Sequence, residues 1–105
     1  MSFHLSAEDI RLDDGHILRA RLHNGEEHVD AEINLNDFIG NDNGNFQWGG
    51  NNFSDSAEGI SFSLEGDDNV PILRAGLKDV EGNVQWRDIN LAERLGNAGG
   101  NFNWE

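Results

Sequence analysis

The chain has 105 residues, a length typical of one globular domain. Asp and Glu number 20 against 7 Lys and Arg, and the resulting formal net charge of −13 argues against binding to nucleic acid or to an anionic membrane surface. The absence of cysteine excludes disulfides, thiolate zinc sites and cysteine nucleophiles, and no apolar stretch is long enough to span a membrane.

The first third of the chain predicts three short β-strands. Residues 10–12 alternate apolar and polar side chains, residues 16–22 resume the pattern after a turn, and residues 28–35 show it most clearly. The last two strands are separated by Asn24-Gly25, a pair typical of a type I′ hairpin turn because both residues tolerate positive φ. We therefore expect a half-buried antiparallel sheet.

A second, smaller hairpin is predicted after this sheet. Residues 36–40 are too few for a long helix and predict a helical turn capped by Asn36. Residues 42–45 predict a hairpin turn, and residues 45–48 a closing strand with its two aromatic side chains on one face.

The second half of the chain repeats the first. Ile33-Asn34-Leu35 recurs at 89–91, and the segment Gly44-Asn45-Phe46-Gln47-Trp48 recurs with one change at 100–104, both shifted by 56 residues. Earlier segments recur with shifts of 50 and 55, which places a five-residue insertion around residues 65–69. We expect two tandem repeats, about 1–50 and about 51–105, that form one all-β, pseudo-symmetric domain over residues 1–105.

The sequence does not predict a catalytic or metal site. Its four histidines share no ligand spacing, and the acidic turns at 13–15 and 67–69 do not match the twelve-residue calcium loop. No serine lies in a Gly-x-Ser-x-Gly elbow, and carboxylate pairs carry no information in so acidic a chain. We therefore expect no enzyme activity, no metal and no cofactor.

Short polar side chains gather on both sides of the repeat boundary. They are Asn41, Asp42, Asn43, Asn51, Asn52, Asp55 and Ser56. Such side chains offer donors and acceptors together, which vicinal sugar hydroxyls need because each hydroxyl both donates and accepts. Two interpretations stay open: a carbohydrate-binding module, and a non-catalytic structural or protein-interaction domain without a sugar site.

The repeated segments resemble the cyanovirin-N homolog family. Residues 33–36, 39–48, 52–53, 89–91 and 100–105 carry the resemblance, which covers essentially the whole chain and is strongest to short, single-domain fungal members. It implies an all-β fold in which each half contains a triple-stranded sheet and a β-hairpin, with strands exchanged between the repeats. It also implies a lectin for mannose-containing, oligomannose-type glycans that needs no metal.

The resemblance further implies two sugar sites at opposite ends of the molecule. What we call the central site would use Asn41, Asp42, Asn43, Asn51, Asn52, Asp55, Ser56, Lys78 and Asp79. What we call the terminal site would use Ser2, His4, Ser6, His23, Asn24, Gly25, Asn97, Ala98 and Gly99. His23 and Gly99 stand where the family has acidic residues, so we expect the central site to bind more strongly.

The family's disulfide positions are Ala7, Leu22, Ala57 and Leu77 in this chain, so apolar packing has to replace the crosslinks. We expect a core of Phe3, Leu18, Leu22, Ile33, Leu35, Phe46, Trp48, Phe53, Leu73, Leu77, Ile89, Leu91, Phe102 and Trp104. We also expect a cytoplasmic protein, because the first residues lack the basic start and apolar segment of a signal peptide; unconventional secretion is compatible with the same sequence.

We expect the protein to be mainly a monomer with a capacity for domain swapping. The repeats meet at residues 49–52, Gly-Gly-Asn-Asn, and if this segment extends, the copies pair between two chains through the same contacts.

Overall fold

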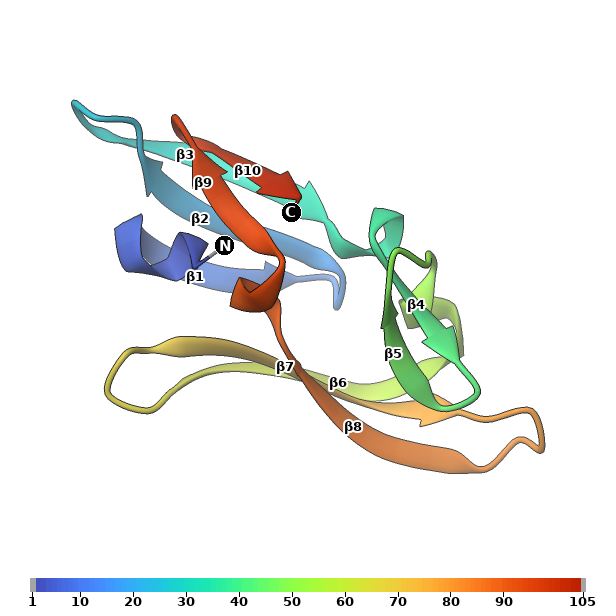
Figure 1. Ribbon diagram of the computed structural model, residues 1–105. Helices are drawn as coiled ribbons and strands as arrows, with labels where there is room; N and C mark the ends of the chain where they lie inside the picture. Colours follow the sequence, from blue (N-terminus) through green and yellow to red (C-terminus); the bar gives the residue numbers. More distant parts are fainter. Residues whose placement is uncertain (1, 105) are drawn as a thin grey trace.

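Ten β-strands and four short 3₁₀ helices follow one another in two similar series in the computed structural model, which describes residues 2–104 (Figure 1). The first series is η1 (Phe3–Ser6), β1 (Ala7–Asp13), β2 (Ile17–His23), β3 (His28–Asn34), η2 (Leu35–Asp37), β4 (Ile39–Asp42) and β5 (Asn45–Trp48). The second is η3 (Phe53–Ser56), β6 (Ala57–Glu65), β7 (Val70–Lys78), β8 (Val84–Asn90), η4 (Leu91–Glu93), β9 (Leu95–Ala98) and β10 (Asn101–Trp104). Within the described residues, no helix is long and apolar enough to cross a membrane.

Each repeat forms a three-stranded antiparallel sheet and a separate two-stranded hairpin. The hairpin does not pack on the sheet of its own repeat. The β4–β5 hairpin lies against β8 and η3, and the β9–β10 hairpin lies against β3 and η1 (Figure 1). The expected all-β fold with strand exchange between the repeats is confirmed.

The five-residue insertion is distributed along one hairpin. Strands β6 and β7 are each two residues longer than β1 and β2, and the loop at 66–69 is one residue longer than the loop at 14–16. Away from this extension the two sheets keep the same register, so that Ala7 pairs with Leu22 as Ala57 pairs with Leu77. The four positions that the resemblance matches to disulfides are therefore neighbours across paired strands.

Two local predictions were wrong. The loop after β2 is not a two-residue type I′ turn, because His23 pairs with His28 across a four-residue loop whose Asn24 Oδ1 accepts from the backbone N–H groups of Glu26 and Glu27. The cap of η2 is Asn34, whose Oδ1 accepts from the backbone N–H of Asn36 at 3.0 Å. Asn34, the last residue of β3, is therefore also the N-cap of η2.

The core is one apolar cluster supplied by both repeats. Of the predicted residues, Phe3, Leu18, Leu22, Leu35, Phe53, Leu73, Leu77 and Leu91 are fully buried, while Ile33, Phe46, Trp48, Ile89 and Phe102 are half-buried. Trp104 is 36% exposed, so its place in the predicted core was wrong. Its ring stacks on Phe38 at the hairpin surface, with ring centroids 5.3 Å apart, and the fully buried Ile39 and Leu95 were missed.

Candidate functional site

Asn41 joins three segments where the β4–β5 turn meets the second repeat. Its Nδ2 donates to Oγ of Ser56 and to the backbone carbonyl of Lys78, both at 2.8 Å, and its Oδ1 accepts from the backbone N–H of Gly44 at 2.8 Å. Both amide N–H donors are used within the protein. Asn41 therefore positions the turn on η3 and on the end of β7, and we call this arrangement the asparagine bracket.

Gly44 lets the turn lie directly against the β7–β8 loop. A Cβ atom at this position would stand 2.8 Å from Cγ of Gln85 and 3.4 Å from Cβ of Asp79. The residue also has φ +87°, a conformation that glycine adopts without strain. The turn and the loop thus pack against each other, and Gly44 is a position in the candidate site that the search for polar residues missed although it belongs to the repeated motif.

Asp79 organises the β7–β8 loop from within. Its Oδ1 accepts from the backbone N–H groups of Asn83 and Glu81, both at 3.0 Å, and its Oδ2 accepts from Nε2 of Gln85 at 3.1 Å. The hydrogen bonds, that from the Asn83 backbone first among them, lower the pKa of the Asp79 carboxyl. Asp79 stays ionised at neutral pH, and its carboxylate oxygens accept hydrogen bonds from the loop and from Gln85.

Asn43 links the β4–β5 turn to the β7–β8 loop. Its Oδ1 accepts from the backbone N–H of Val80 at 3.0 Å, and its Nδ2 makes no hydrogen bond within residues 2–104. The side chains of Asn43 and of its neighbour Asp42 are exposed. Two donors and a carboxylate therefore face solvent beside the bracket.

The start of the second repeat adds further polar groups. Ser56 Oγ accepts the bond from Asn41, so its O–H proton is free to donate elsewhere. The preceding residue, Asp55, is exposed, and its carboxylate makes no hydrogen bond within the described chain. Lys78 is exposed and enters the bracket only through its carbonyl. The structure thus brings Asn41, Asp42, Asn43, Asp55, Ser56, Lys78 and Asp79 into one region.

Asn51 and Asn52 lie at the base of the β4–β5 hairpin. The backbone N–H of Asn52 donates to the carbonyl of Asn36 at 2.8 Å, and a Cβ at Gly40 would stand 2.9 Å from the backbone nitrogen of Asn51. No hydrogen bond within residues 2–104 joins either side chain to the turn at 42–45. Asn52 nevertheless adjoins the rest of the predicted central site, because it precedes η3 and its backbone carbonyl accepts from the N–H of Asp55 at 3.1 Å.

The terminal site contains the same bracket. Asn97 Nδ2 donates to Oγ of Ser6 at 2.8 Å and to the carbonyl of His23 at 2.9 Å, and its Oδ1 accepts from the N–H of Gly100 at 2.9 Å. Each contact matches one made by Asn41. The two ends of the molecule therefore share one backbone scaffold.

The side chains around the two brackets differ. Where the central site has Asp55, Asp42 and Asn43, the terminal site has Leu5, Ala98 and Gly99. Leu5 is 72% exposed and offers no hydrogen-bonding group. The terminal site thus keeps the scaffold without three of the polar side chains that surround it at the central site.

The other predicted terminal residues make mostly internal contacts. Nδ1 of His23 accepts from the backbone N–H of Gly25 at 3.0 Å, and Asn24 Oδ1 closes the loop. The backbone N–H of Ser2 donates to the carbonyl of Ala92 at 2.9 Å. His4 Nδ1 is buried without a hydrogen-bond partner in the described part of the chain. These groups shape the terminal loops more than they present a binding surface.

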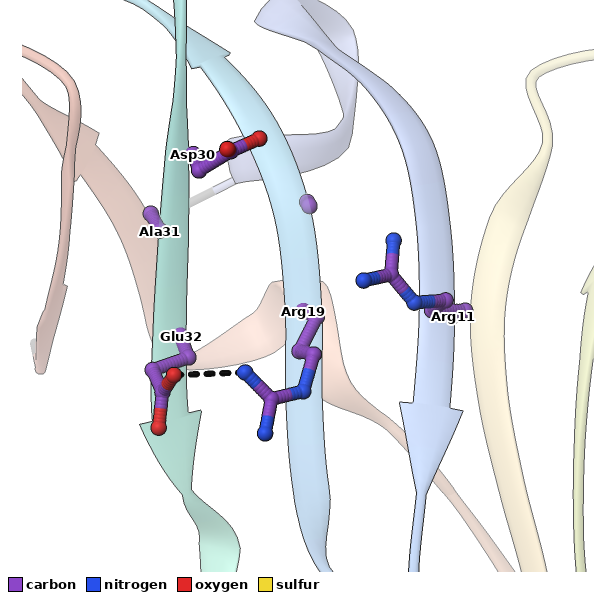
Figure 2. Close-up of a pocket in the computed structure, with 6 residues that line it drawn as sticks. Arg11, Arg19, Asp30, Ala31 and Glu32 are labelled. Atoms are coloured by element: carbon purple, nitrogen blue, oxygen red, sulfur yellow. Dashed lines mark hydrogen bonds and ion pairs between the residues drawn. The ribbon is translucent and has the colours of Figure 1, made fainter.

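A shallow polar hollow lies away from both ends, on the outer face of the β1–β2–β3 sheet. Figure 2 shows Arg11 on β1, Arg19 on β2 and Glu32 on β3, with Nη1 of Arg19 2.5 Å from Oε1 of Glu32. Nε of Arg19 also lies 2.7 Å from Oδ2 of Asp13. These side chains form ion pairs with one another across the strands, so they stabilise the sheet itself.

Comparison with known proteins identifies relatives over nearly the whole chain. The model of the CVNH domain family matches residues 3–103. A Cyanovirin-N homolog from Neurospora crassa is 48% identical, with 97% of this chain and 96% of that protein covered.

Two solved structures are informative about the fold and its ligands. A designed Cyanovirin-N homolog lectin, LKAMG, is similar with a TM-score of 0.92 and 41% identity, with all of both chains covered. A MoCVNH3 variant solved in complex with (N-GlcNAc)4 is similar with a TM-score of 0.85 and 25% identity, with 99% of this chain and 97% of that chain covered.

Proposed function

Because this chain belongs to the CVNH domain family, we propose that it is a lectin that binds mannose-containing, oligomannose-type glycans at the central site, through hydrogen bonds and without a metal ion. The description of one relative as a lectin and the (N-GlcNAc)4 complex of another support carbohydrate as the ligand class. Within residues 2–104, no group of three or more His, Cys, Asp or Glu side chains is placed to hold a metal.

One observation carries the choice of site. Both ends of the molecule have the asparagine bracket, but Asp42, Asn43 and Asp55 surround only the central one. A bracket alone exposes few hydrogen-bonding groups, because both of its amide donors are used. Sugar recognition needs additional donors and acceptors, and the central site supplies them.

The groups at the central site suit a pair of vicinal hydroxyls. The Asp55 carboxylate can accept from two neighbouring hydroxyls, while the Ser56 hydroxyl and the Asn43 amide can donate to their oxygens. A hydrogen bond to a charged group contributes about 1.5–3 kcal/mol. Asp55 is therefore the side chain whose loss should weaken binding most.

Calorimetric titration with mannobiose in the presence of EDTA tests the proposal. Asp55→Ala should bind roughly tenfold to a hundredfold more weakly than the parent, at an unchanged melting temperature. Asp67→Ala is the matched control, because it also removes an exposed carboxylate, in the distant β6–β7 loop. His23→Ala should change the affinity little.

Three results would contradict the proposal. If His23→Ala loses binding and Asp55→Ala does not, the terminal site is the active one. If EDTA abolishes binding, a metal takes part. If the parent shows neither heat nor chemical-shift changes at millimolar mannobiose, the protein is not a mannose lectin, and a protein-interaction domain becomes the better interpretation.

A further inference from the structure

Trp86 is the most exposed aromatic side chain among the described residues, with 64% of its surface accessible. It lies on β8 between Gln85 and Arg87. These neighbours point toward the β4–β5 hairpin, since Nε of Arg87 donates to the carbonyl of Gly44 at 3.1 Å and Gln85 lies beside the same glycine. Because side chains alternate along a strand, Trp86 lies on the outer face of the β6–β7–β8 sheet.

The indole lies along this sheet face rather than standing out from it. Trp86 pairs with Gly76 on β7, and a Cβ at Gly76 would be 3.2 Å from Cη2 of the indole. A Cβ at Gly59 on β6 would be 2.7 Å from the same atom. Neighbouring strands are about 4.8 Å apart, so a ring that starts on β8 and reaches β6 has to lie across β7. The distal edge of the ring therefore lies over two glycines, beside Val84, and most of the side chain stays accessible to solvent.

The first repeat shows that the fold does not require this aromatic surface. The positions equivalent to Trp86, Gly76 and Gly59 are Asp30, Arg21 and Asp9. Arg21 Nη1 lies 2.7 Å from Oε1 of Glu8 and 3.7 Å from Oδ2 of Asp9 there. Figure 2 shows Asp30 among the charged side chains of that face. A charged sheet face supports the same architecture, so core packing does not account for Trp86.

Hydrogen-bonding groups lie along one edge of the ring. Arg74, Arg87 and Asp88 line a hollow beside Trp86, and Arg74, whose guanidinium is ion-paired with Glu65, stands opposite Asp88 across β7 and β8. A flat apolar surface with a guanidinium and an exposed carboxylate at one edge suits a neutral ligand with one apolar face and a polar rim. A pyranose has this form, because its axial C–H groups can meet the electron-rich ring face while its hydroxyls contact donors and acceptors.

We propose that Trp86 is the stacking platform of a second carbohydrate subsite, which holds a pyranose ring of a longer glycan against the outer face of the β6–β7–β8 sheet. This inference rests on the proposed function, because it extends the ligand of the central site. Gly76 lies two residues before Lys78 on β7, so by strand rise the platform begins about 7 Å from the bracket. An oligosaccharide longer than mannobiose can span that separation.

Titration with two ligands tests the subsite. The parent and Trp86→Ala are titrated by calorimetry with mannobiose and with a high-mannose nonasaccharide. Trp86→Ala should bind mannobiose as the parent does and the nonasaccharide roughly tenfold more weakly, while Trp86→Phe should retain most of the parent affinity. Trp104→Ala is the control for the loss of an indole on the β9–β10 hairpin, and its stability is measured as well because the Trp104 ring stacks on Phe38.

The indole N–H resonance of Trp86 supplies a second readout and should shift with the nonasaccharide but not with mannobiose. If the parent binds both sugars and Trp86→Ala binds both with parent affinity, the subsite does not exist. If Trp86→Ala changes sedimentation but not sugar affinity, the surface is a contact between chains, which also overturns the proposal. If the parent ignores mannobiose while the nonasaccharide shifts the Trp86 resonance, the subsite stands and the central site fails.

Discussion

Replacing Asn41 by alanine should destabilise the protein and weaken sugar binding together. The substitution removes two hydrogen bonds of 2.8 Å that join the β4–β5 turn to η3 and β7, and a third of the same length within the turn. It also leaves the backbone N–H of the buried Gly44 without its acceptor. At about 1 kcal/mol for each bond, reduced for the exposed carbonyl of Lys78, the free energy of unfolding should fall by about 2–3 kcal/mol.

Asn97→Ala is the matched substitution at the other end of the molecule. Asn97 makes the same three bonds, so its loss should reduce stability by a similar amount. Its bracket, however, supports the terminal site, which lacks three polar side chains found at the central site. Asn97→Ala should therefore leave mannobiose affinity near that of the parent, whereas Asn41→Ala should lower it at least tenfold because the turn that carries Asn43 is released.

Thermal unfolding and calorimetric titration measure the two effects separately. At roughly 4 °C per kcal/mol for a domain of this size, each variant should melt roughly 8–12 °C below the parent. The reasoning is refuted if Asn41→Ala unfolds within about 0.5 kcal/mol of the parent, since the bracket would then contribute less than a single net hydrogen bond. It is also refuted if both variants lose the same affinity, because binding would then follow overall stability and not the central site.

Two further predictions concern pH and assembly. The hydrogen bond from Arg74, with a second from Ser63, lowers the pKa of Glu65 from 4.5 to about 2, so this group's contribution to stability is complete above pH 4.5 and is lost as the pH falls toward 2. In Arg74→Gln the Glu65 pKa, measured by NMR titration, should return toward 4.5; a value that stays near 2 would contradict the ion pair as its cause. The parent should sediment mainly as a monomer at micromolar concentration, and Gly50→Ala should raise the fraction of swapped dimer, because the added Cβ would lie 2.9 Å from the Cα and N of Gly40 and oppose the bent linker. Sedimentation of the parent only as a dimer would overturn this prediction.

The sequence by itself determined the elements and their duplication. Alternation of apolar and polar residues predicted the strand at 28–35, and the pair Asn43-Gly44 predicted the hairpin turn in which both residues have positive φ. The change in the shift of the repeats from 50 to 55 residues located the lengthened β6–β7 hairpin. These features are local, because each depends on the conformational preferences of a few consecutive residues.

Burial was predicted less completely, and Trp104 shows why. Its alternation within β10 matches that of Phe102, yet Phe102 packs against the core while Trp104 is 36% exposed. Alternation tells which side chains share a face of a strand. It does not tell which element covers that face, and Trp104 contacts Phe38 and Trp48 at the surface while Phe102 packs against the core.

Only the tertiary structure decided how the central site is built. Asn41 finds its partners 15 and 37 residues away, and Asn97 finds its partners 91 and 74 residues away. Composition alone does not distinguish one Asn near the repeat boundary from another as a sugar ligand. The structure separates Asn41, whose amide donors are used in the bracket, from Asn43, whose donors are free. The physical reason is that a side-chain amide has two donors, and only the folded contacts determine whether protein acceptors already occupy them.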